Sequence, residues 1–276
     1  MRFLHKVLVG IGVFFAAAWI GTLMSSCSGA SEPVPSLETI LERYGDQEPE
    51  LWGEDIPGVL RTFGPEGKQV ALTLDACGGP RGSGYDREIV EFLREKGIRA
   101  TLFLNARWIE ANPGIAADLA EDPLFVIANH GWQHKPCSVT GRSAWGIEGT
   151  KSLEEAYREI EKGAEAVRKL TGKRPGFYRS GTNYYDEIAV AVARDLGMKV
   201  TGWSVLGDEG ATLPAEGVAK RVAEAKAGQI ILCHMNQPES GTAEGLKKGI
   251  PVLLEKGFSF VTLDEVFPAE DDDLSF

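Results

Sequence analysis

Short apolar runs alternate with amphipathic segments along most of the chain from Gln69 onward. Runs that are rich in Val, Ile, Leu and Phe and end in turn residues are typical of buried strands. The alternation with helical segments predicts a parallel sheet wrapped by helices, either open or closed into a barrel, and about seven strands approach a closed barrel. The predicted strands cover residues 70–74, 99–104, 124–128, 176–178, 198–203, 229–232 and 258–263.

The predicted helices carry their own start and stop signals. Asp86 precedes a segment whose apolar residues recur at helical spacing, and Gly97 ends it. Ser152, followed by Glu155, predicts a capping box ahead of a longer helix that Gly172 closes. The same reasoning predicts helices over residues 36–45, 186–196 and 214–227.

The N-terminal part of the chain has a different pattern. Arg2 and Lys6 precede an uncharged apolar run, which small residues and Cys27 follow. This order predicts a signal peptide over residues 1–27, and the sequence before Cys27 resembles the lipobox of bacterial lipoproteins, with Cys27 as the lipidated residue. The alternative is an uncleaved membrane anchor. Both predict a protein of the bacterial cell envelope, tethered to the membrane and facing outside the cytoplasm.

The rest of the chain divides into two predicted parts. Residues 28–68 are first Pro-rich and then rich in Gly, Pro and acidic residues, which predicts a tether and an N-terminal extension. Residues 69–268 hold the strand and helix pattern and form the predicted catalytic domain. The formal charge of −11 and the pI of about 5.0 argue against a nucleic-acid partner, because such a surface is basic.

Polar residues gather where the predicted strands end. Asp75, Arg179 and His234 each stand at or just after a strand, and His130 and His134 follow another. The carboxyl ends of parallel strands line the functional site of such folds. Two imidazoles four positions apart suit a metal ion, although the alternative is that both rings only pad a loop.

Five segments, in this order, resemble the motifs of the polysaccharide deacetylase family, also known as the NodB homology domain or carbohydrate esterase family 4. They are Thr73-Leu74-Asp75, His130-Gly131-Trp132-Gln133-His134, Tyr178-Arg179-Ser180-Gly181, Gly202-Trp203-Ser204 and Ile231-Leu232-Cys233-His234. The resemblance spans about residues 69–263 and implies a distorted (β/α) barrel. It also implies a metal-dependent hydrolase that removes N-acetyl groups from a cell-wall polysaccharide, an amino sugar like that of peptidoglycan or chitin.

The resemblance further implies roles for individual residues. His130 and His134 would bind a divalent metal, zinc in the first place with cobalt or nickel as alternatives, together with a carboxylate. Asp75 would take the proton of the attacking water, and Arg179 would orient Asp75 and hold it ionised. His234 would protonate the departing amine, which is a poor leaving group as an anion.

The first motif departs from the family pattern, because Ala76 stands where the family has a second aspartate. The third metal ligand is therefore open between Asp75, Cys77 and Asp208. Two alternative functions follow: a metal-dependent hydrolase of a non-carbohydrate amide or ester, and a non-catalytic glycan-binding protein that has lost the metal.

Two further groups of residues carry predictions. Trp203 is expected to line the acetyl pocket and Tyr184 to stack on a sugar ring, although packing is the commoner use of such side chains. The cysteine count of an exported protein favours pairing. We predict a disulfide between Cys77 and Cys137, with Cys233 free and buried because strand alternation points it away from the site; the alternative is three reduced cysteines.

Overall fold

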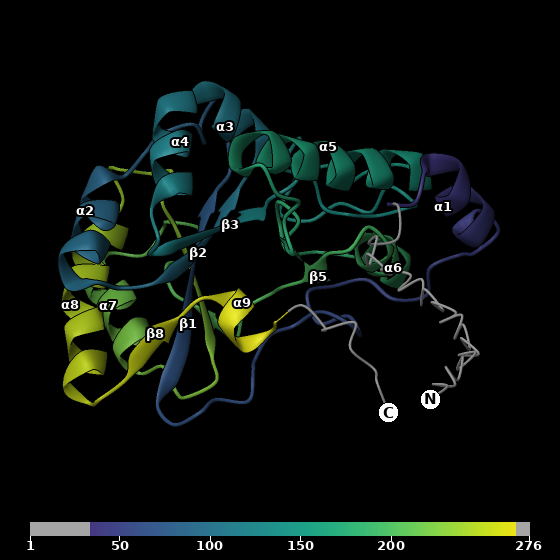
Figure 1. The fold of residues 1–276 in the computed structure, drawn as a ribbon. Coiled ribbons are helices and arrows are strands. Elements are labelled where there is room, and N and C mark those ends of the chain that lie inside the picture. The colour runs from purple at the N-terminus through teal and green to yellow at the C-terminus, as the bar shows by residue number, and fades with distance from the viewer. Residues whose placement is uncertain (1–33, 269–276) are drawn as a thin grey trace, which may run out of the picture. The chain divides into compact units, whose positions relative to one another are not determined.

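Eight parallel strands form one sheet within residues 34–268, which are the residues that the computed structural model describes (Figure 1). Seven of them follow the order β5-β4-β3-β2-β1-β7-β6, and β8 pairs with the first residues of β1. The sheet curves into a half-barrel, which confirms the predicted distorted barrel of about seven parallel strands. The strands are β1 (Gln69–Ala76), β2 (Ala100–Leu104), β3 (Phe125–Asn129), β4 (Phe177–Tyr178), β5 (Lys199–Val200), β6 (Val205–Leu206), β7 (Ile230–His234) and β8 (Ser259–Val261).

The helices between these strands begin at the predicted caps. The side chains of Ser36, Asp86 and Ser152 each accept a hydrogen bond from a backbone N–H in the first turn that follows. Gly97 and Gly172 end two of the helices in the left-handed conformation. The helices are α1 (Leu37–Tyr44), α2 (Arg87–Lys96), α3 (Ala106–Ala111), α4 (Pro113–Glu121), α5 (Leu153–Thr171), α6 (Glu187–Asp195), α7 (Ala215–Ala223), α8 (Thr242–Glu255) and α9 (Leu263–Val266).

Strand β1 is the central strand and its two faces have different neighbours. Leu72, Leu74 and Ala76 belong to the apolar cluster that also contains the buried faces of α2 and α8. Ala71 belongs to a separate cluster, with Phe103. Because side chains alternate along a strand, Thr73 and Asp75 share the face of Ala71 and point away from α2 and α8.

The register of the sheet brings the polar strand ends together. Asp75 on β1 lies level with His234 on β7. On the other side of β1, β2 and β3 run in register up to Asn129, the residue before His130. Asn129 in turn pairs with Tyr178, the residue before Arg179. All the predicted site residues on these strands therefore lie at one rim of the half-barrel.

The N-terminal extension packs on this unit from residue 34 onward. Ile40 of α1 is fully buried in a cluster with residues of α5 and α6. Single β-bridges join Gly53 to Tyr185 after β4, Leu60 to Thr201 after β5, and Thr62 to Gln229 before β7. The predicted signal peptide, Cys27 and the start of the tether lie outside the described residues. Within residues 34–268, no helix is both long and apolar enough to cross a bilayer.

Candidate active site

A buried ion pair stands at the centre of the rim. Arg179 is fully buried, and its Nη1 donates to Asp75 Oδ1 at 2.7 Å and to Thr73 Oγ1 at 3.0 Å. Its Nε and Nη2 donate to the carbonyl oxygens of Thr201 and Gly202 at 3.0 and 2.8 Å. These contacts fix the guanidinium, which in turn fixes the orientation of the Asp75 carboxylate. The second carboxylate oxygen, Oδ2, lies 3.5 Å from Nε2 of His130.

His130 is held in one tautomer by the backbone. Its Nδ1 lies 2.9 Å from the carbonyl oxygen of Arg179, which can only accept, so Nδ1 carries the proton. The other ring nitrogen, Nε2, faces the Cys77 sulfur at 3.8 Å. This is the arrangement of a metal-binding histidine, whose other ring nitrogen donates to a carbonyl oxygen.

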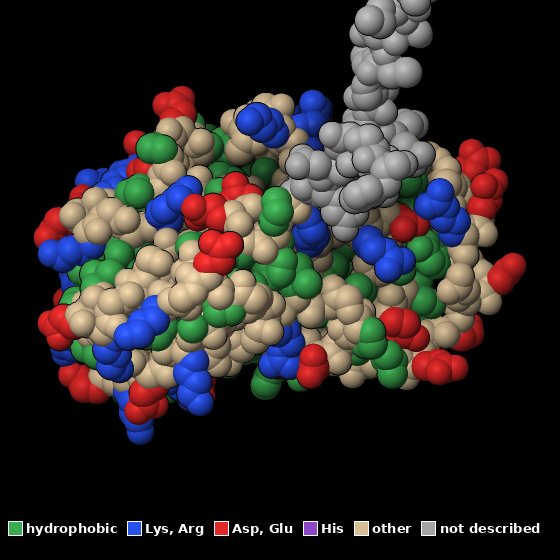
Figure 2. All heavy atoms as spheres, turned by 60° about the horizontal axis from the view of Figure 1, so that its bottom comes forward, with side chains coloured by type: hydrophobic (Ala, Val, Ile, Leu, Met, Phe, Trp, Pro, Cys, Tyr) green, Lys and Arg blue, Asp and Glu red, His purple; other side chains and the backbone are tan. Residues whose placement is uncertain are grey.

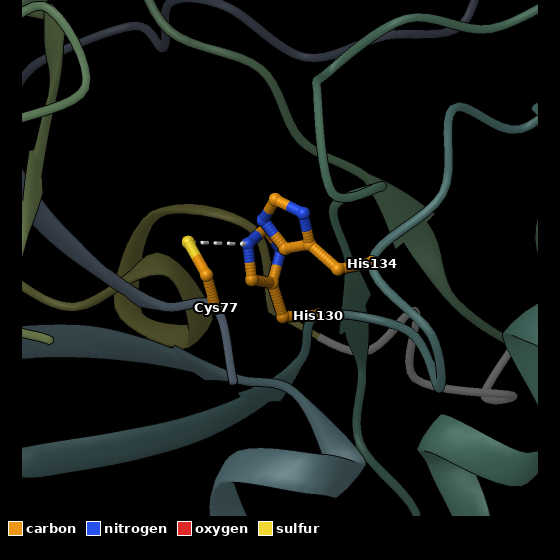
Figure 3. Close-up of side chains that lie close together, drawn as sticks. All are labelled: Cys77, His130 and His134. Carbon is orange, nitrogen blue, oxygen red and sulfur yellow. Dashed lines mark hydrogen bonds between the residues drawn. The ribbon is translucent and has the colours of Figure 1, made fainter. Parts of the chain in front are cut away.

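Cys77, His130 and His134 point toward one another from two loops at the rim (Figure 3). One ligand atom from each of the three lies within 4.8 Å of the others. The rings of His130 and His134 are perpendicular, with centroids 5.0 Å apart. The structure therefore brings the predicted histidine pair together and adds a sulfur to it.

These three residues fit a metal ion by two tests. Nε2 of His134 is buried and has no hydrogen-bond partner within the described part of the chain, a costly arrangement that a metal would relieve. One thiolate and two imidazoles are donors that zinc prefers. Burial raises the pKa of the Cys77 thiol, but the imidazoles of His134, His130 and His234 outweigh it and bring this pKa well below its ordinary value. Of the three candidates for the third ligand, only Cys77 belongs to this compact group.

The geometry of β1 explains why Cys77, and not Ala76, lies beside the histidines. Ala76 is fully buried on the face that packs against α2 and α8. Cys77 follows Ala76 and, like Asp75, approaches His130. An alternating backbone thus places Asp75 and Cys77 on the side of His130 and Ala76 in the core.

His234 is positioned by a buried carboxylate. Its Nδ1–H donates to Asp208 Oδ1 at 2.9 Å, and its backbone N–H donates to Oδ2 of the same residue at 2.7 Å. The Thr242 hydroxyl also donates to this Oδ2, at 3.0 Å, so both carboxylate oxygens are engaged. Burial lowers the pKa of His234, but the charge and hydrogen bond of Asp208, with a smaller contribution from Cys77, raise it well above its ordinary value. The sequence presented Asp208 as a candidate metal ligand, whereas in the structure it orients and charges His234.

A second buried carboxylate, Glu159 of α5, holds the loop that carries the histidines. Its oxygens accept from the backbone N–H of Gln133 at 2.8 and 2.9 Å and from that of Lys135 at 3.3 Å. His134 between them has a φ of 62°, the left-handed region that costs a residue with a side chain about 1–2 kcal/mol. Sequence reasoning missed Glu159. The available signal was an acidic residue next to Ile160 on the apolar face of a helix.

Replacing Glu159 by alanine is expected to lower the free energy of unfolding by about 2–3 kcal/mol, because buried N–H groups lose their acceptor. Zinc affinity should fall about 10–100-fold as the loop loses its support. Thermal unfolding and a zinc competition titration measure the two effects. The matched control is Glu154→Ala on the same helix, whose side chain is half exposed and pairs with Arg158, and which should change stability by less than about 1 kcal/mol. Equal effects of the two variants would contradict this role for Glu159.

The predicted disulfide between Cys77 and Cys137 is wrong, because both cysteines are free. The Cys77 sulfur faces His130 at the rim. Cys137 is fully buried in another cluster with Tyr178 and Tyr185, and burial raises its pKa. The two thiols therefore lie in different environments, one beside imidazoles and the other in the apolar core. Cys233 is free and buried, as predicted.

The two predicted substrate residues stand at the rim with partly exposed side chains. The carbonyl oxygen of Trp203 accepts from Nε of Arg61 in the extension at 2.8 Å. Tyr184 lies in the loop after Arg179, with its ring centroid 5.7 Å from that of Trp52. Their contacts with a sugar stay predictions.

Comparisons with known proteins point to one family. The family model described as polysaccharide deacetylase matches residues 64–201, which is half of the chain. The peptidoglycan-N-acetylglucosamine deacetylase PgdA of Listeria monocytogenes is 28% identical over 201 residues, or 72% of this chain. The chain spans only 39% of the length of that relative.

Solved structures that resemble this chain belong to the same family. The Bc1960 peptidoglycan N-acetylglucosamine deacetylase is 26% identical with a TM-score of 0.63, over 76% of this chain and 92% of that one. A Bacillus anthracis protein, BA3943, is described as a CE4 family pseudoenzyme, and its mutant with restored activity is 25% identical with a TM-score of 0.63, over 75% and 70% of the two chains. The motifs, the half-barrel and the matched family model together show that this chain belongs to the polysaccharide deacetylase family.

Proposed function

We propose that the chain is an exported, metal-dependent deacetylase that removes N-acetyl groups from an amino-sugar polysaccharide of the cell wall, of the peptidoglycan type. The observation that carries this proposal is the pairing of Asp75 with His234 across neighbouring strands, beside the cluster of Cys77, His130 and His134. Each of the two has its own buried partner, Arg179 for Asp75 and Asp208 for His234. A base and an acid with separate partners suit the hydrolysis of an amide.

The residues of the site have separate roles in the proposed reaction. When bound by Cys77, His130 and His134, a divalent metal such as zinc supplies polarisation of the acetyl carbonyl and lowers the pKa of a nearby water. Asp75 accepts the proton of the attacking water on the oxygen that Arg179 leaves free. His234, protonated through its contact with Asp208, donates a proton from Nε2 to the departing amine.

The proposal of a cell-wall substrate is supported by the names of similar proteins. The names of PgdA and Bc1960 specify peptidoglycan N-acetylglucosamine as the substrate of those proteins. Export follows from the signal pattern of residues 1–27, with Cys27 as the proposed lipid anchor to the membrane. A membrane-tethered enzyme outside the cytoplasm would meet such a polymer directly.

Acetate release from N-acetylglucosamine oligomers and from peptidoglycan tests the proposal, with the full chain supplied with zinc or cobalt. His234→Ala is expected to lower kcat about 10²–10⁴-fold without weakening metal binding, because the acid is lost and the proposed ligands remain. Unchanged acetate release by this variant would remove the acid role.

A non-catalytic glycan-binding protein is the second candidate, since Ala76 replaces an expected aspartate and a structural neighbour is described as a pseudoenzyme. Glycan binding without acetate release, at saturating zinc or cobalt, would favour it. A hydrolase of a non-carbohydrate amide or ester would instead bind metal and leave both glycans intact.

A further inference from the structure

Three aromatic side chains from three separate segments form a cluster close to the active site. Trp52 comes from the N-terminal extension, Trp145 from the loop before α5, and Tyr184 from the loop after β4. The ring of Tyr184 contacts both others: its centroid lies 5.7 Å from that of Trp52, with the planes inclined by 49°, and 5.8 Å from that of Trp145, with the planes nearly perpendicular at 88°. We call Trp52, Trp145 and Tyr184 the aromatic platform.

Trp145 is displayed to solvent by a strained turn. Ala144 and Ile147 exchange backbone hydrogen bonds of 3.1 and 2.9 Å, and the two residues between them have positive φ angles, 54° for Trp145 and 75° for Gly146. Such two-residue turns favour Asn or Asp at the position of Trp145, because a larger side chain is strained there. The indole is nevertheless 71% exposed. Packing within the fold therefore does not account for a tryptophan in this conformation, and a strained, exposed aromatic residue points to binding.

The platform is anchored to the strand end that carries Arg179. The backbone groups of Gly53 and Tyr185 exchange two hydrogen bonds of 3.0 Å, which fixes Trp52 beside Tyr184. The carbonyl oxygen of Tyr184 accepts from the Cys137 N–H at 3.0 Å and from the Ser180 hydroxyl at 3.1 Å. Ser180 follows Arg179 directly.

The loop that carries Tyr184 also touches the loop that carries His130 and His134. At Gly181, between Ser180 and Tyr184, a Cβ would lie 2.4 Å from the carbonyl oxygen of His134, so the two loops are in direct backbone contact. The loop that carries Tyr184 is therefore packed directly against the loop that carries the two histidines.

We propose that the aromatic platform is a second sugar subsite, which binds a pyranose ring of the polysaccharide at a distance from the acetyl group that reacts. This inference rests on the proposed function and deepens it, since it makes the substrate a chain of several sugars. A pyranose has an apolar C–H face that matches an indole or phenol ring, while its hydroxyls stay in water or reach polar groups at the edge. Glu54 is such a group, because it lies near enough to Tyr184 for its charge to act on the phenol.

Other ligands fit the surface less well. The net charge of −11 disfavours an anionic polymer or an anionic membrane surface at an exposed aromatic site. On the face drawn in Figure 2, acidic and basic side chains are interspersed and form no large field of one sign. Trp52 lies outside residues 64–201, which the family model matches, so the extension of this chain contributes part of the platform.

Binding of N-acetylglucosamine oligomers of increasing length to the full chain tests this inference by calorimetry or tryptophan fluorescence. Trp145→Ala is expected to weaken binding of long oligomers about 5–10-fold, which corresponds to about 1–1.4 kcal/mol, and to affect the disaccharide less. Trp145→Tyr should restore most of the affinity, because it returns an aromatic face. Leu254→Ala, which removes another exposed apolar side chain on α8, serves as the control and should leave all affinities unchanged.

The outcomes separate this inference from the proposed function. Equal affinities of wild type and Trp145→Ala, or no binding of any oligomer by the wild type, would overturn the subsite. If the wild type released acetate in those cases, the proposed function would stand without it. Length-dependent binding that needs Trp145, in a protein that releases no acetate, would support the subsite and leave the non-catalytic candidate.

Discussion

Asp75→Asn is expected to lower kcat for acetate release about 10²–10⁴-fold while zinc binding is retained. Asparagine has the shape of aspartate, and its oxygen can still accept the hydrogen bond that Arg179 Nη1 now donates at 2.7 Å. It cannot accept the proton of the attacking water. Steady-state kinetics on an N-acetylglucosamine oligomer and the zinc content of the purified protein measure the two effects.

A control is needed because Asp75 also neutralises a buried cation. Removal of one partner of a buried ion pair costs about 3–5 kcal/mol, so activity must be compared at a temperature where both proteins are folded. Asp55→Asn is the matched control, since Asp55 forms an ion pair of 3.1 Å with Arg61 but its side chain is 80% exposed. That variant should retain full activity. Loss of zinc by Asp75→Asn would show that Asp75 acts as a ligand, and activity within about threefold of wild type would exclude it as the base.

Local pattern and topology together made much of this molecule predictable. The start of α2 at Asp86 and that of α5 at Ser152 follow from side chains that satisfy the first N–H groups of a helix. The convergence of Asp75 and His234 follows from parallel strands, whose carboxyl ends meet at one rim whatever their separation in sequence. The distorted barrel and the gathering of polar residues at one rim could therefore be predicted without any distances.

Contacts between residues on different loops could not be predicted from local pattern and topology. The Cys77–Cys137 disulfide was wrong because the cysteine count favours pairing but does not show that one sulfur faces imidazoles and the other lies in the core. Asp208 precedes His234 by many residues, and only their pairing reveals its role. Strand β6, with two residues, is too short for any periodic pattern. Glu159 stands out as an acidic residue on the apolar face of a helix, but the sequence does not show which backbone N–H groups it accepts from.

Cys77→Ser is expected to remove the thiolate from the metal centre, with a large loss of affinity and a spectroscopic change. With cobalt in place of zinc, a thiolate ligand gives a near-ultraviolet sulfur-to-metal charge-transfer band. We expect this band in the wild-type protein and its absence in Cys77→Ser, in which His130 and His134 remain. Zinc affinity, measured with a competing chelator, should fall at least about 100-fold, because a serine hydroxyl stays protonated where the thiol is a ligand anion.

Cys137→Ser is the matched control for this experiment. It also removes one thiol, but one that lies in a buried apolar cluster and does not belong to the group of Cys77, His130 and His134. The cobalt band and the zinc affinity should therefore be those of the wild type even if stability falls. A band that persists in Cys77→Ser would exclude Cys77 as a ligand. If cobalt bound to the wild type without any such band, the remaining donor near the histidine pair would be Asp75, whose Oδ2 lies 3.5 Å from Nε2 of His130. Asp75 would then be a metal ligand. Because Arg179 and the metal together would occupy both of its carboxylate oxygens, another residue at the rim would have to act as the base.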